Sequence, residues 1–115
     1  MNQDAFREIV VKGVDDKVGG RRGSYSITRV VKGLATTGPR NYMMCMTMVR
    51  KRSGGHIVLR TYISNDRYAS CGTSRVLERR GQPSIGVAMS EAMNRDNLIW
   101  NDVKEVDPAL YGRQS

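Results

Sequence analysis

The alternation of apolar and polar residues predicts a hairpin near the middle of the chain. Apolar side chains fill nearly every position from Tyr42 to Val49, a basic turn with two glycines follows, and a second apolar run extends from His56 to Ile63. Two such runs joined by a short glycine-containing turn are typical of antiparallel strands. Upstream, residues 24–31 are rich in β-branched side chains and predict a further strand.

A helical period appears at residues 84–94. Apolar residues recur there with the spacing of a single helix face, at Ile85, Ala88, Met89, Ala92 and Met93. Proline directly before this segment is compatible with the start of a helix. The predicted fold class is therefore α+β: a small antiparallel sheet of about four to five strands, with one main helix at about residues 84–94 packed on a face.

The two ends of the chain are less regular than its middle. The three β-branched residues at 9–11 lose rotamer freedom in a helix, so they favour a short strand ending at Gly13 over a helix. Residues 98–103 predict the last strand, and another short strand is expected near 68–71 or 75–77. We expect a single domain over residues 1–107, followed by a flexible C-terminal tail at 108–115.

The Met-rich strand at 42–49 is apolar on both faces. Met44, Met46 and Met48 share one face, and Cys45 and Val49 share the other. A strand of this kind is expected to be central and covered on both sides. One helix is predicted to cover one face, so the second cover must be another layer or another copy of the protein. We expect a second copy, which makes the protein a homo-oligomer through residues 42–49. A partner protein on the same adaptable methionine surface is the alternative.

Charge is concentrated in the middle of the chain. Residues 17–80 hold 14 Lys or Arg and only two acids, Asp66 and Glu78, whereas both ends are mildly acidic. Fourteen of the 19 cationic residues of the whole chain are arginine. A dense basic block attracts polyanions, and the planar guanidinium group pairs with phosphate through two parallel hydrogen bonds. Nucleic acid, either DNA or RNA, is therefore the expected partner.

Other features narrow the classes of function. No apolar run is long enough to span a membrane, and no secretory signal is visible, so a cytoplasmic location without a membrane partner is expected. Cys45 and Cys71 are interpreted as reduced thiols. His56 is the single histidine, so we expect no metal site, no cofactor and no enzymatic activity. Asp66 and Glu78 are interpreted as ion-pair partners of arginine rather than as ligands of a catalytic Mg²⁺.

Three parts of the chain carry the candidate binding residues. They are the glycine-rich basic loop before the first strand, the turn of the central hairpin, and one face of its return strand. Arginines there are expected to contact phosphates and tyrosines to stack on bases of a single strand. The candidates are Arg21, Arg22, Tyr25, Arg29, Arg50, Lys51, Arg52, Arg60, Tyr62 and Arg67.

These observations favour a non-enzymatic nucleic-acid-binding protein of low sequence specificity. The alternative is a small adaptor or inhibitor, of the kind that phages and plasmids use to modulate a host, which binds an acidic surface of a partner protein. Binding that weakens steeply with salt for any strand offered indicates the first. Indifference to oligonucleotides indicates the second. No motif is specific enough to assign a family.

Overall fold

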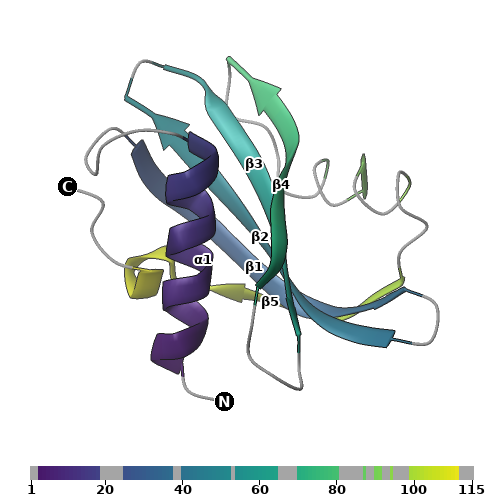
Figure 1. Ribbon diagram of the computed structural model, residues 1–115. Coiled ribbons are helices and arrows are strands. Elements are labelled where there is room, and N and C mark those ends of the chain that lie inside the picture. The colour runs from purple at the N-terminus through teal and green to yellow at the C-terminus, as the bar shows by residue number, and fades with distance from the viewer. Residues whose placement is uncertain are drawn as a thin grey trace.

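The computed structural model describes residues 3–18, 25–37, 40–52, 54–64, 70–80, 87, 90–91, 94 and 99–111. One helix, α1 (Gln3–Val18), lies against a five-stranded antiparallel sheet (Figure 1). The strands are β1 (Tyr25–Thr37), β2 (Arg40–Lys51), β3 (His56–Ser64), β4 (Ser70–Arg79) and β5 (Ile99–Val106), and their order is β4-β3-β2-β1-β5. The predicted α+β class is confirmed.

The central hairpin lies where it was predicted, although β2 extends beyond residues 42–49 at both ends. β2 pairs with β3 from Tyr42 opposite Ser64 to Arg50 opposite His56. The turn depends on Gly54 and Gly55, whose φ angles of 103° and 83° lie in the left-handed region that favours glycine. β1 and β4 are longer than expected. β4 includes residues 75–77 and the second half of 68–71, whose first two residues lie outside the described part.

The N-terminal strand prediction is wrong, because residues 9–13 lie inside α1. Phe6, Val10 and Val14 recur every fourth residue and are almost completely buried against the sheet. The apolar area buried by this face outweighs the small helix penalty of β-branched side chains. Tertiary packing, which a local pattern of β-branched residues does not report, therefore decides the conformation.

α1 packs very closely on the edge strand β4. A methyl group on Gly13 would lie 2.2 Å from Oγ1 of Thr73, well inside contact distance. Thr73 is held in turn by a 2.9 Å hydrogen bond between its hydroxyl and that of Thr61. Glycine therefore allows this close approach at the point where the helix meets β4.

The C-terminal part bears on two predictions. Of the predicted helix at 84–94, only Val87, Ser90, Glu91 and Asn94 are described, and all four are helical; its other residues lie outside the described part. Of the expected flexible tail at 108–115, residues 108–111 form a short 3-10 helix, η1 (Pro108–Tyr111), and residues 112–115 lie outside the described part. The ring of Tyr111 is buried and meets Phe6 edge to face, so η1 is packed on the domain.

β2 is the central strand and is buried on both faces, as predicted. Cys45 and Val49 pack on the α1 side, whereas Met44, Met46 and Met48 pack with Trp100 on the other. These three methionines are 0% exposed within a single chain. A second copy is therefore not needed to cover them, which removes the argument for self-association through residues 42–49. Trp100 is a core residue.

No helix of the described residues has the length and apolar character needed to cross a membrane.

Candidate functional site

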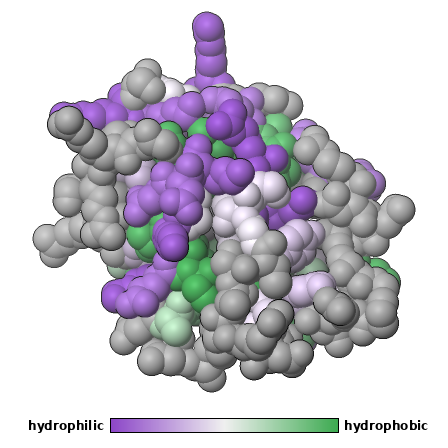
Figure 2. All heavy atoms as spheres, viewed as in Figure 1, coloured by the Kyte–Doolittle hydropathy of each residue, from purple (hydrophilic) through white to green (hydrophobic). Residues whose placement is uncertain are grey.

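One end of the sheet gathers exposed cations. The β2–β3 turn, the end of β4 and the last turn of α1 meet there, at the top of the molecule in Figure 1. Hydrophilic side chains follow this rim and continue down over α1 (Figure 2). We call this surface the basic end and define it by six residues: Lys17, Arg50, Lys51, Arg52, Arg75 and Arg80.

The tip of the β2–β3 hairpin carries the most accessible charges. Arg50 and Arg52 are exposed, and neither has an ion-pair partner among the described residues. The hairpin backbone bonds across the turn, from the amide of Lys51 to the carbonyl of Gly55 and from the amide of Gly54 to the carbonyl of Lys51, each at 3.0 Å. These bonds link Lys51, which lies between the two arginines, to the glycines on the other side of the turn.

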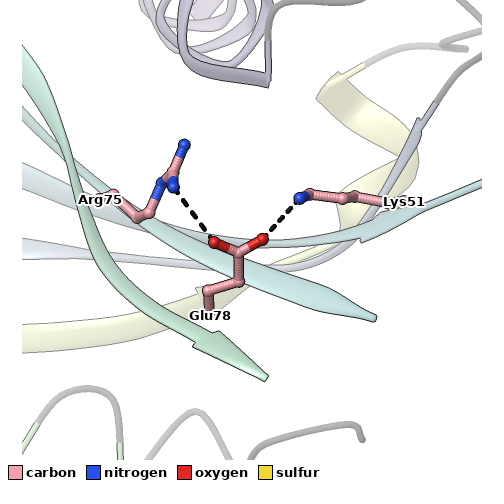
Figure 3. A network of polar contacts seen from close by, with 3 residues as sticks. All are labelled: Lys51, Arg75 and Glu78. Carbon is pink, nitrogen blue, oxygen red and sulfur yellow. Dashed lines mark hydrogen bonds and ion pairs between the residues drawn. The ribbon is translucent and has the colours of Figure 1, made fainter. Parts of the chain in front are cut away.

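A shared carboxylate links two further cations of the basic end. Glu78 accepts a hydrogen bond from Lys51 at 2.6 Å on one oxygen and from Arg75 at 3.1 Å on the other (Figure 3). Lys51 lowers the pKa of Glu78 by hydrogen bonding and by its charge, and the charge of Arg75 contributes less. Glu78 is therefore an ion-pair partner of basic residues, as interpreted from the sequence.

The acids near the basic end leave it with an excess of positive charge. Asp15, Asp16 and Glu78 lie on the same elements as its six cations. Asp15 is engaged by the hydroxyl of Tyr25, which donates a hydrogen bond to its carboxylate. The remaining field favours anions at this end of the molecule.

Arg29 lies on a different part of the molecule from the hairpin tip. It is on β1 beside the edge strand β5, where its guanidinium donates to Glu105 through Nε at 2.8 Å and Nη2 at 2.5 Å. This pair neutralises the arginine locally. Arg29 is therefore a weaker candidate for a phosphate contact than the sequence suggested.

The predicted stacking face is not an open surface. Arg60, Tyr62, His56 and Val58 do alternate along β3 on one face, but that face carries the methionine core. Tyr62 is half-buried, its ring lies beneath the Arg60 guanidinium at 5.1 Å, and it meets Tyr42 edge to face. Arg60 also donates weakly to Ser74 at 3.4 Å. These side chains support one another instead of presenting a platform for bases.

Tyr25 is not available for stacking either. Its ring is 2% exposed and packs with Val14 and Val49 beneath α1. The sequence pattern did not distinguish a tyrosine beside a basic loop from a core tyrosine, because the helix that covers it was predicted as a strand.

Three candidate residues lie outside the described part, and three cations that were not candidates join the basic end. Arg21, Arg22 and Arg67 lie outside the described residues. Lys17, Arg75 and Arg80 join the basic end, although they were not among the predicted contacts. The pairing of β3 with β4 brings Arg75 and Arg80 toward the hairpin tip. This could not be predicted, because the sequence did not define the limits of β4.

Two observations on the described residues concern metal binding and the reactivity of a thiol. Within them, no group of three His, Cys, Asp or Glu side chains is arranged to hold a metal ion. Burial raises the pKa of the Cys45 thiol to about 12, against a small opposite influence of Lys32. Because the thiolate is the reactive form, Cys45 is a poor nucleophile near neutral pH.

Comparison with known proteins gives no assignment. No protein-family model matches the chain, and neither a curated protein nor a solved structure matches it significantly.

Proposed function

We propose that this protein binds nucleic acid without catalysing a reaction, and that the basic end holds the sugar-phosphate backbone. The observation that carries the proposal is the exposed pair Arg50 and Arg52 at the β2–β3 hairpin, next to Lys51 and Arg75. Guanidinium groups suit phosphate oxygens because they donate two parallel hydrogen bonds.

Low sequence specificity follows from the residue types involved. Contacts to phosphate and sugar fix position and orientation but do not read bases. Tyr25 and Tyr62, the tyrosines expected to stack, are engaged in the fold. Backbone contact is therefore the main source of affinity in this proposal, and it applies to DNA and RNA alike.

The arrangement of Glu78 supports an anion site between Lys51 and Arg75. Its two oxygens already bridge these cations, much as two oxygens of a phosphate group would. Glu78 is about half exposed, so a phosphate at the surface would compete with its carboxylate for Lys51 and Arg75. The carboxylate then competes with the ligand and moderates its affinity.

Fluorescence anisotropy tests the proposal with labelled single-stranded DNA, duplex DNA and RNA over a range of salt concentrations. We expect log K to fall linearly with log salt concentration. Arg50→Ala with Arg52→Ala should reduce the slope by about two, since each lost phosphate contact removes about one. Lys104→Ala, which removes an exposed cation on β5, is the control. A folded wild-type protein that binds none of the three ligands at low salt contradicts the proposal.

Exposed apolar side chains favour a second candidate, binding of a partner protein. Leu34 of β1, Ile99 and Val103 of β5 and Leu110 of η1 are substantially exposed, and β1 lies beside both β5 and η1. Exposed apolar patches commonly mark protein interfaces. Retention of one partner protein after a wash in high salt, by wild type but not by Ile99→Ser with Val103→Ser, would support the adaptor interpretation.

A further inference from the structure

A cleft separates α1 from the edge strand β4. It has a volume of about 410 Å³ and is lined by five residues of α1 between Ile9 and Lys17 and by Gly72 and Thr73 of β4. β4 is the outer strand of the sheet on this side, so the cleft lies at the margin of the molecule.

The floor of the cleft is closed by direct contact between its walls. At Gly13 the helix approaches Thr73 so closely that a methyl group has no room. A ligand of the cleft therefore lies along its open side. A nucleic-acid duplex is too broad to enter between a helix and the strand it touches.

The charged groups of the cleft favour an anion. Lys12 and Lys17 are exposed, and within the described part of the chain neither has a hydrogen bond or an ion pair. Asp16 also lines the cleft and opposes them, which leaves a net charge of one positive unit. On the other wall, Gly72 is exposed with a φ of 121° and has no side chain, so a ligand can approach the backbone.

The cleft leads toward the basic end. α1 and β4 run in the same general direction, and both reach the basic end (Figure 1). Lys17 is in the last turn of α1, and Arg75 is two residues beyond Thr73 on β4. Arg75 is in turn linked to Lys51 at the hairpin through Glu78 (Figure 3). Cations thus follow one line from Lys12 to the hairpin tip.

We propose that the α1–β4 cleft holds the phosphate backbone of a single nucleic-acid strand that continues from the basic end. This inference rests on the proposed function and makes it more specific. Lys12 and Lys17 bind phosphates along the helix wall, while Asp16 limits the affinity. The ligand class is a single strand of DNA or RNA, with the bases directed outward to solvent.

Lysine footprinting tests the inference on the wild-type protein. An acylating reagent is applied with and without a single-stranded oligothymidylate, and with a duplex of equal length, and modification is read by mass spectrometry. We expect the single strand to protect Lys12 and Lys17 several-fold but to leave Lys104 on β5 unchanged. The duplex should not protect the two cleft lysines.

Two variants measure the same site by affinity. Lys12→Ala with Lys17→Ala should weaken single-strand binding about tenfold at low salt, and Asp16→Asn should strengthen it. Circular dichroism checks that each variant is folded.

If the wild type binds no nucleic acid, the proposed function itself fails. If it binds, but Lys12 and Lys17 stay unprotected and only the Arg50 and Arg52 variant loses affinity, the function stands and the cleft is not its site. Equal protection by the duplex overturns the assignment to a single strand.

Discussion

The two edges of the sheet are built alike but charged differently. At β4, Gly13 of α1 lets the helix touch Thr73; at β5, Gly33 of β1 lies against the ring of Trp100. Beside β5 the nearby arginine, Arg29, is matched by Glu105. Beside β4 a single carboxylate serves two cations, and further exposed arginines stand next to them.

This comparison shows how a fold divides a block of like charge. In the sequence, residues 17–80 form one basic region. In the structure, acids from distant segments neutralise some of its cations, as Glu105 does for Arg29 across 76 positions. Among the described residues, Arg50, Arg52 and Arg80 remain exposed at the hairpin tip and the end of β4, where a polyanion would meet them.

The largest effect is expected for Gly33→Ala at the β5 edge. The added methyl group would lie 2.0 Å from Nε1 of Trp100 and 2.8 Å from the carbonyl oxygen of Asn101. A buried ring and a backbone atom yield little, so the variant should lose about 1–3 kcal/mol of stability. Urea denaturation measures this change. Leu34→Ala, on an exposed neighbour in the same strand, should cost much less, and equal losses would contradict the packing argument.

Gly13→Ala at the β4 edge should have a smaller effect. The clash with Oγ1 of Thr73 destabilises the fold, but alanine improves the helix propensity of α1 by up to about 1 kcal/mol. We expect a net loss of about 1 kcal/mol, measured by thermal unfolding. Adding Thr73→Ala removes the clashing oxygen, so the double variant should lose less than the sum of the two single variants. Strict additivity would show that the two residues do not meet.

Nucleic-acid affinity should also differ between variants at the two edges of the sheet. Arg50→Ala with Arg52→Ala is expected to weaken nucleic-acid affinity about tenfold, or about 1.4 kcal/mol. Arg29→Ala should change affinity by less than twofold, because Glu105 already neutralises that side chain. Anisotropy titrations at one fixed salt concentration compare them. An equal loss for both variants would mean that the sheet edges do not differ as ligand sites.

The smallest effect on nucleic-acid affinity is expected when Glu78 or Glu105 is replaced. Glu78→Gln should raise affinity about threefold, since it frees Lys51 and Arg75 for phosphate. Glu105→Gln makes the same change in net charge beside β5 and should raise it less. Because both variants have the same net charge, the ratio of their affinities measures how strongly the Glu78 carboxylate competes with the ligand. A ratio of one would remove Glu78 from the site.

Sequence patterns predicted the parts of this fold that depend on local order. The β2–β3 hairpin and the doubly buried β2 followed from alternation and from apolar runs. α1 did not, because its stability comes from burying Phe6, Val10 and Val14 against strands far along the chain. Of the candidate contacts, Arg50 and Arg52 lie exposed as expected at a turn, whereas the positions of Tyr25 and Arg29 depend on partners that no local pattern specifies.

The salt dependence of binding tests most directly whether the basic end holds the phosphates of a nucleic acid. Anisotropy titrations of the wild type, the Arg50 and Arg52 double variant, and Arg29→Ala give the slope of log K against log salt concentration. We predict a steep slope for the wild type and a slope smaller by about two for the double variant. Arg29→Ala should have the slope of the wild type. A folded wild-type protein that does not bind at low salt, or three identical slopes, would contradict it.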